Sequence, residues 1–170
     1  MLKAELFNEF FVTQSILDES STSLPTNYPT AHSHMHQLVI TEYETYKILN
    51  NLDTSKATGP DGIGNRLLKE AAIAVSEPLS KLFQISLNLG IYPTLWKQAS
   101  VTALHKKGSI YDCNNYRPIS LLPCVSKVFE KLVFDQMYSY LTRNNHISPN
   151  QSGFRPVTLP FGSWYRSATK

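Results

Sequence analysis

The stretch LHKKGSIYDCNNYRPISLL (104–122) decides how this 170-residue chain folds. It carries one cation on each side of a short polar loop, Lys106 before the loop and Arg117 after it. If the loop turns back as a hairpin, both cations point at one spot. Arginine offers a planar fork of donors and lysine a mobile charge, which is the usual arrangement around phosphoryl oxygens. The stretch therefore predicts a polyphosphate site, with two plain surface cations as the alternative.

The residues that flank this stretch predict a strand before the loop and a long helix after it. Residues 97–105 alternate between apolar and polar, as in a half-buried strand. The apolar run 117–122 completes the hairpin. After Pro123, apolar residues recur at steps of three and four, which predicts an amphipathic helix as far as residue 144. The side of the strand expected to be buried carries Ala99, Val101 and Ala103.

Most of the chain before residue 97 predicts helices. Thr41 and Glu44 form a capping box at the start of a helix over residues 42–52. Another helix is predicted over residues 3–17, and Trp96 is interpreted as a core anchor rather than a base-stacking platform. The apolar stripe of the helix over 42–52 consists of Tyr43, Tyr46, Leu49 and Leu52.

Proline, glycine and aspartate mark the ends of two further predicted helices. Pro78 is expected in the first turn of a helix over 78–89, where its missing N–H costs nothing. Gly90 suits a left-handed cap at the end of that helix. Asp61 is placed to start a helix over 63–75.

Three parts of the chain differ in composition. Residues 1–37 combine the first helix with a linker rich in Ser, Thr and Pro, and residues 38–155 hold the remaining predicted elements. Residues 156–170 carry Pro, Gly and Ser without periodicity and are expected to pack loosely. The linker gives its histidines no scaffold, so no metal site is predicted from His32, His34 and His36.

Charge and cysteine content exclude several classes of protein. Residues 97–131 hold six basic and two acidic side chains, although the net charge of the whole chain is only +3. Positive charge thus begins near the loop stretch, which favours a phosphate-bearing partner over a merely solvated basic face.

Two cysteines, Cys113 and Cys124, indicate neither a zinc site nor a disulfide framework. Without a membrane span or signal peptide in the sequence, we expect a cytoplasmic or nuclear protein that is not secreted and has no membrane partner.

Several motifs follow one another in an order typical of one protein family. They are FNEFF (7–11), KATGPDGI (56–63), WKQA (96–99), KKG (106–108), NYRPISLL (115–122), KVFEK (127–131) and NQSGFR (150–155). Together they resemble the fingers and early palm of the reverse transcriptases of non-LTR (LINE-type) retrotransposons, over about residues 3–155. The resemblance implies an α+β fold, mainly helical with a fingers-type β-hairpin, as part of a right-hand polymerase.

The resemblance also implies roles for individual residues. Lys106 and Arg117 match the positions that bind the incoming deoxynucleotide. Lys56 matches a basic residue near the nucleic-acid backbone, with a plain turn between helices as the alternative. The implied partners are an RNA template, a DNA primer and a deoxynucleotide. The segment that lies against the template in the family is matched by Gln151, Gly153, Phe154 and Arg155, although Phe154 has packing alone as an equal alternative.

The family's catalytic aspartates have no counterpart in this sequence. They come from F-x-x-D and Y-x-D-D motifs that follow the G-F-R motif and hold Mg²⁺ in the full-length family, but the match stops after Pro156. We therefore expect a fragment without catalytic residues, metal ligands or a bound cofactor, inactive alone as a nucleotidyltransferase. The alternatives are a non-catalytic nucleic-acid-binding module and a poorly folded translated relic.

Overall fold

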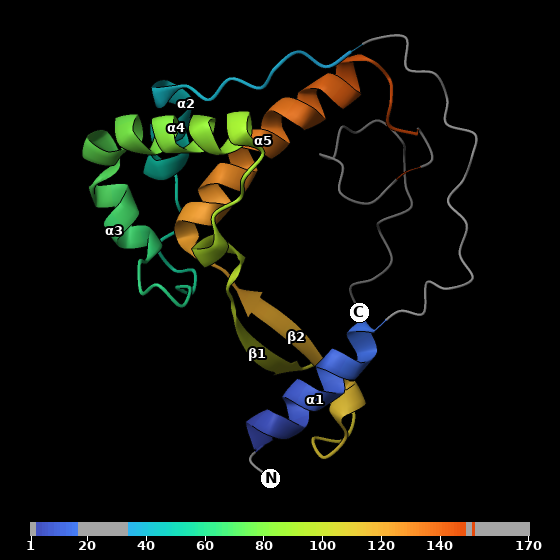
Figure 1. Cartoon of the computed structure of the whole chain (residues 1–170). Coiled ribbons are helices and arrows are strands. Elements are labelled where there is room, and N and C mark those ends of the chain that lie inside the picture. Colours follow the sequence, from blue (N-terminus) through green and yellow to red (C-terminus); the bar gives the residue numbers. More distant parts are fainter. Residues whose placement is uncertain (1–2, 17–33, 149–150, 152–170) are drawn as a thin grey trace, which may run out of the picture.

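The computed structural model describes residues 3–16, 34–148 and 151. These residues form α-helices, two short 3-10 helices and one antiparallel hairpin (Figure 1). The mixture of helix and sheet confirms the predicted α+β class. The helices are α1 (Lys3–Ser15), α2 (Glu42–Asn50), α3 (Asn65–Glu70), α4 (Ala72–Leu89) and α5 (Cys124–Arg143), and the strands are β1 (Ser100–His105) and β2 (Tyr116–Leu121).

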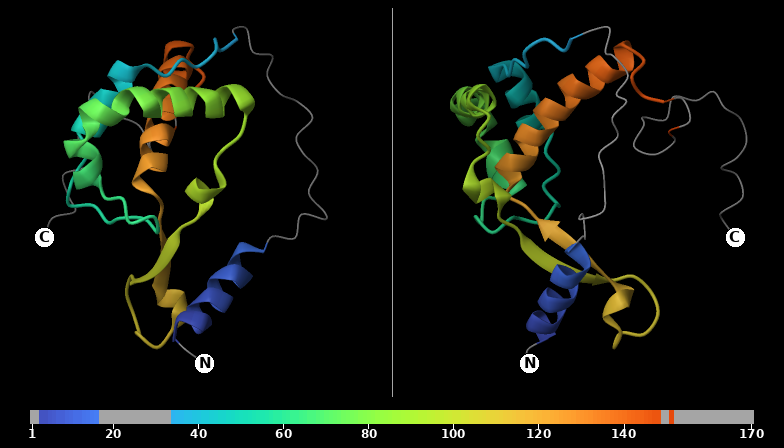
Figure 2. Two further views of the ribbon diagram at one scale, coloured as in Figure 1. Left: turned by 60° about the vertical axis from the view of Figure 1, so that its left-hand side comes forward. Right: turned by 45° about the vertical axis from the view of Figure 1, so that its right-hand side comes forward.

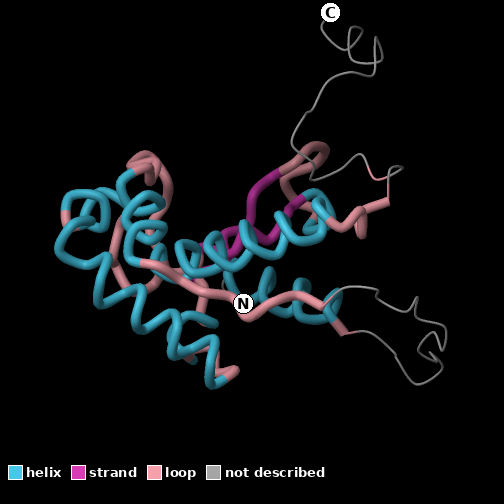
Figure 3. Tube along the Cα trace, turned by 90° about the horizontal axis from the view of Figure 1, so that it is seen from above, coloured by secondary structure: helices cyan, strands magenta, loops and turns pink. Residues whose placement is uncertain are grey.

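Helices α2 to α5 form a helical body, and the hairpin projects from it with α1 alongside (Figures 1 and 2). Seen from above, the strands of the described chain are confined to this hairpin (Figure 3). No helix among the described residues combines the length and the apolar character that a membrane crossing requires. The buried core lies wholly in the helical body and the segment before it: Ile40, Leu49, Leu68, Ala72, Phe83, Cys124, Val128, Phe129 and Leu132.

The predicted capping box at the start of α2 is confirmed. The amide of Glu44 donates to Thr41 Oγ1 at 3.2 Å, and the amide of Thr41 donates to Glu44 Oε2 at 3.3 Å. Leu49 of the predicted stripe is fully buried, but Tyr43 is 68% exposed and Thr45 is buried in its place. Tyr43 precedes Thr45 by two residues, which places the two side chains about 200° apart around the helix. Tyr43 therefore faces solvent when Thr45 faces the core.

The predicted division between the next two helices is wrong. The expected helix over 63–75 is only α3, and α4 already begins at Ala72. Pro78 therefore lies inside α4 instead of starting a helix. Pro78 is exposed, and packing of α4 against α2 outweighs the hydrogen bond that the proline cannot donate.

The ends of these two helices show one wrong and one confirmed prediction. Asp61 does not cap α3, because its Oδ1 accepts from the amide of Ile63 at 3.2 Å and the N-cap is Gly64. Gly90 does end α4 in the left-handed region, with φ 64°. The amide of Ile91 donates to Ser86 O at 3.1 Å, which satisfies a carbonyl at the end of the helix.

The predicted hairpin is confirmed, with Leu104 opposite Arg117 and Ala103 opposite Pro118. The predicted half-buried strand is only partly correct, because Val101 is 58% exposed while Ala103 is half-buried. Of the elements that the structure describes, α1 alone covers this side of the hairpin, through contacts such as that of the Phe7 and Tyr116 rings, whose centroids lie 4.6 Å apart. The hairpin therefore adds nothing to the buried core.

The long helix after the hairpin and the role of Trp96 are also confirmed. α5 packs Val128, Phe129 and Leu132 into the core. The ring of Trp96 lies 5.6 Å from that of Phe83 and 5.7 Å from that of Phe129. An aromatic cluster of this kind fixes the chain between α4 and β1 on the helical body.

Two glutamines hold an extended segment, residues 38–40, on the helical body. Gln84 of α4 accepts from the amide of Ile40 at 2.7 Å and donates to Leu38 O at 3.2 Å. Gln136 of α5 accepts from the amide of Val39 at 3.2 Å and donates to Val39 O at 2.7 Å. Each glutamine thus satisfies the backbone as a neighbouring strand would. In Figure 1 this segment, in light blue, runs across the body to α2.

Candidate nucleic-acid interface

The hairpin places Lys106 and Arg117 on one face. Lys106 follows β1, and its amide donates to Asn115 O at 2.7 Å, which extends the ladder by one residue. Arg117 pairs with Leu104. Because alternate residues of a strand share a face, Leu104, Lys106, Asn115 and Arg117 lie on the same side. The two cations are diagonal neighbours, whose typical separation at the backbone is about 7–8 Å.

This cationic face is open. Side chains on the opposite face of the hairpin, including Ala103, Tyr116 and Pro118, line a groove beneath α1. Lys106 and Arg117 are both exposed, and neither side chain has an ion pair or hydrogen bond with the part of the chain that the structure describes. Among the described residues, therefore, no carboxylate competes with an incoming phosphate for these two cations.

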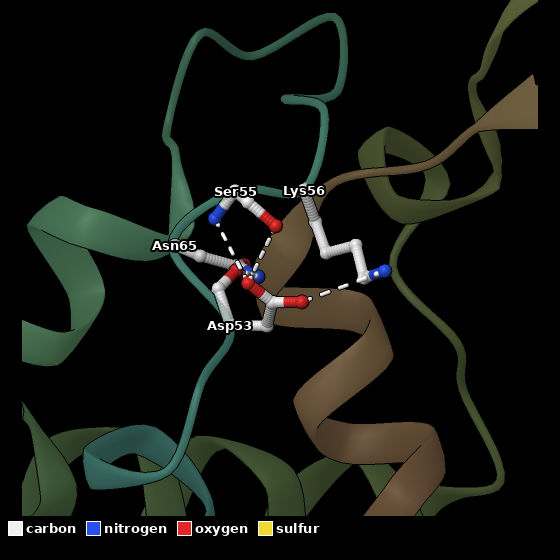
Figure 4. Close-up of polar contacts among 4 residues, drawn as sticks. All are labelled: Asp53, Ser55, Lys56 and Asn65. Atoms are coloured by element: carbon white, nitrogen blue, oxygen red, sulfur yellow. Dashed lines mark hydrogen bonds and ion pairs between the residues drawn. The ribbon is translucent and has the colours of Figure 1, made fainter.

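Lys56, in contrast, already has a counter-ion (Figure 4). Its Nζ lies 3.4 Å from Asp53 Oδ2. Asp53 Oδ1 accepts from the hydroxyl of Ser55 at 2.7 Å and from its amide at 3.0 Å, and these bonds lower the pKa of Asp53. The buried Asn65 donates from Nδ2 to Asp53 O at 2.8 Å and fixes the loop to α3. Exposed ion pairs contribute little free energy, so a phosphate can still compete for Lys56.

The loop that follows Lys56 packs against the exit of the hairpin. A Cβ at Gly59 would lie 2.5 Å from Pro123 N and 2.6 Å from Leu122 C and O. Only a residue without a side chain permits this approach. The loop 56–62 is thereby tied to the junction between β2 and α5, a role for Gly59 that sequence reasoning missed.

The predicted template segment is almost entirely outside the described residues. Gly153, Phe154 and Arg155 all lie there. Gln151 is described and exposed, and its amide donates to Ser148 O at 3.1 Å. Their contacts with a template stay predictions.

The described aspartates each have a local partner. Asp53 and Asp61 lie in the loop between α2 and α3, Asp112 lies in the hairpin loop and Asp135 lies on α5, where it pairs with Lys131. Within the described ranges no three His, Cys, Asp or Glu side chains lie close enough to hold a metal ion. A pair of neighbouring carboxylates is what nucleotidyl transfer requires. The fifth aspartate, Asp18, is outside the described residues, and Cys113 and Cys124 are free thiols.

Sequence comparison identifies relatives among Drosophila melanogaster mobile elements, whereas no protein-family model matches. The RNA-directed DNA polymerase from mobile element jockey is 32% identical over 117 residues, which are 68% of this chain and 13% of that protein. The probable RNA-directed DNA polymerase from transposon BS is 27% identical over 143 residues, 84% of this chain and 15% of the relative. The probable RNA-directed DNA polymerase from transposon X-element is 32% identical over 113 residues, which are 66% of this chain and 12% of that protein.

These matches confirm the resemblance that the motifs indicate. The chain spans less than one sixth of the length of each of these relatives. The chain is homologous to the RNA-directed DNA polymerases of non-LTR retrotransposons and matches a fragment of such a polymerase.

Proposed function

We propose that the chain forms the fingers and first palm helix of a retrotransposon RNA-directed DNA polymerase, with the β1–β2 hairpin as its phosphate-binding element. The observation that carries this proposal is the shared, open face of Lys106 and Arg117. The partners would be an RNA template, a DNA primer and a deoxynucleotide. The names of the relatives support this class of substrate.

The two cations suit complementary tasks at a triphosphate. Arg117 offers a planar fork that binds two oxygens at once, and Lys106 offers a point charge on a flexible stem. Cations placed at the phosphates neutralise charge as it redistributes during transfer. The rigid helical body behind the hairpin would hold them in position. The proposed role is limited to binding and positioning.

A binding assay with two matched double variants tests the proposal. The probe is a fluorescein-labelled single-stranded RNA followed by anisotropy at several salt concentrations. We expect the unmodified chain to bind with a dissociation constant of about 10⁻⁴–10⁻⁶ M that weakens steeply with salt. Changing Lys106 and Arg117 to alanine should weaken binding and flatten the salt dependence by about 0.7 per lost phosphate contact. Changing Lys47 and Lys81, on α2 and α4, removes the same charge away from the hairpin.

Equal losses from the two double variants would show that only net charge matters and would refute the site. A primer-extension assay tests the limitation to binding. With a primed RNA template, Mg²⁺ and all four deoxynucleotides, we expect no extension by the chain alone. Template-dependent extension by the purified chain would show that it contains the catalytic carboxylates after all.

A further inference from the structure

The tip of the hairpin presents a bare aromatic ring. Tyr111 is 92% exposed. Among the large hydrophobic residues that the structure describes, it is the most exposed. Its neighbour Ile110 is 59% exposed. Tyr111 lies between the KKG and NYRP motifs, so the resemblance assigns it no role. A single exposed aromatic residue is unremarkable by itself, and its surroundings decide whether it has a function.

The loop around Tyr111 is held by its own hydrogen bonds. The amide of Tyr111 donates to Ser109 Oγ at 3.2 Å, and the hydroxyl of Tyr116 donates to Ile110 O at 3.0 Å. Asn115 Nδ2 donates to Ser109 O at 3.0 Å and closes the loop from the other side. The backbone is therefore fixed while the ring is left outside. Binding to the ring therefore needs little further ordering of the loop backbone, which limits the loss of conformational entropy to the side chain.

A glycine makes the start of this loop possible. Gly108 has φ 81°, a region that residues with side chains rarely adopt. A Cβ there would also lie 2.7 Å from Asn115 Nδ2, the donor that closes the loop. The turn thus depends on glycine for both its conformation and its space.

The loop that carries the ring is basic. Lys106, Lys107 and Arg117 flank it in the sequence and are exposed, and Asp112 is the one acid between them. Asp112 Oδ1 accepts from Asn114 N at 3.0 Å and from Asn114 Nδ2 at 2.9 Å, and these bonds lower its pKa. The negative charge of Asp112 is thus satisfied within the loop. Exposed aromatic rings on positively charged elements are what binds single-stranded nucleic acids without sequence preference.

We propose that Tyr111 is a stacking platform for a base of a single-stranded nucleic acid whose phosphates contact Lys106, Lys107 and Arg117. The inference rests on the proposed phosphate-binding role of the hairpin and adds a contact with the base. Stacking suits any base, because every base has a π face, so it gives no sequence preference. A duplex keeps its bases stacked internally and cannot use the ring.

The test separates bases from phosphates with two probes of equal length. One is a labelled twelve-nucleotide RNA, and the other is the same ribose-phosphate strand without bases. Stacking of about 1–3 kcal/mol corresponds to about 5- to 140-fold tighter binding of the strand with bases. Tyr111→Ala should abolish this preference without changing binding of the abasic strand. Tyr111→Phe keeps a ring and should retain the preference.

Each outcome gives a decision. Urea unfolding first checks that Tyr111→Ala leaves stability unchanged, as expected for a side chain this exposed. Equal weakening of both strands by Tyr111→Ala, or no preference for bases in the unmodified chain, overturns the stacking role. The phosphate role still stands if the Lys106 and Arg117 variant weakens binding of the abasic strand. If Tyr111→Ala leaves the binding of every RNA unaffected, stacking is refuted.

Discussion

Replacing Gly59 by alanine should destabilise the chain, although such a change in a loop often stabilises a protein. Where the backbone conformation suits alanine, the smaller entropy of the unfolded chain contributes about 0.4–1 kcal/mol. Gly59 has no positive φ, so space alone decides. The new Cβ would lie 2.5 Å from Pro123 N and 2.6 Å from Leu122 C and O. These are backbone atoms and cannot rotate away.

The loop or the hairpin exit must therefore shift to restore ordinary contacts. Overpacking of this kind costs about 1–3 kcal/mol, and at the middle of both ranges the entropic gain leaves a net loss of about 1.3 kcal/mol. With a urea slope of about 2 kcal/mol per molar, the unfolding midpoint should fall by about 0.7 M. Circular dichroism in the far ultraviolet measures this midpoint.

Gly64→Ala is the control, because it changes another glycine close by. Its Cβ would meet only the hydroxyl oxygen of Thr58, at 3.1 Å, and that side chain can rotate. Gly64 is also the N-cap of α3, where alanine is less favourable than glycine, so we expect a loss below about 1 kcal/mol. A neutral or stabilising Gly59→Ala, or a larger loss at Gly64, would refute the packing of the loop on the hairpin exit.

Three further predictions concern the helical body and the segments next to it. Phe83→Ala should cost about 3–5 kcal/mol in urea unfolding because Phe83 is fully buried, whereas Ile73→Ala on the same helix, at a side chain 80% exposed, should change stability by less than about 0.5 kcal/mol. Thr41→Ala removes the capping box and should cost about 0.5–2 kcal/mol, and Thr41→Ser should restore most of the loss. Burial, together with a hydrogen bond to Glu130, raises the pKa of Tyr92 to about 12. The unfolded chain releases this proton first, so stability should fall as pH rises from about 10 to 12, and Tyr92→Phe should reduce that slope. Equal losses at Phe83 and Ile73, an unchanged Thr41→Ala, or an identical pH slope in Tyr92→Phe would contradict the respective assignment.

Local signals in the sequence predict some helix ends well and others poorly. The capping box of α2 and the left-handed Gly90 depend only on a few neighbouring residues, so the sequence is sufficient for both. Pro78 misleads because proline is compatible with a first turn but does not require one. The true break at Ala71 has no glycine, proline or capping side chain to indicate it. It depends on how α3 and α4 pack against α2, which is information from the whole fold.

In the candidate site, too, some features are predictable from the sequence and others are not. Prediction of the hairpin is enough to place Lys106 and Arg117 on one face, because alternation along paired strands fixes the side. The exposure of Val101 is not predictable from that alternation, since only α1 covers the hairpin there. The close approach of Gly59 joins distant segments and leaves no local trace. The only sequence signal for Tyr111 is a single aromatic residue within a polar loop.

The hydrogen bonds that Gln84 and Gln136 make to residues 38–40 have a mechanical consequence. Hydrogen bonds to an extended segment lie roughly perpendicular to it, as between paired strands. A force along the segment therefore loads the four bonds of Gln84 and Gln136 together in shear, rather than peeling them one at a time. The two glutamines also come from different helices, so the load is shared between α4 and α5. A force applied from the N-terminal side thus reaches α2 only after the hydrogen bonds of both glutamines have broken.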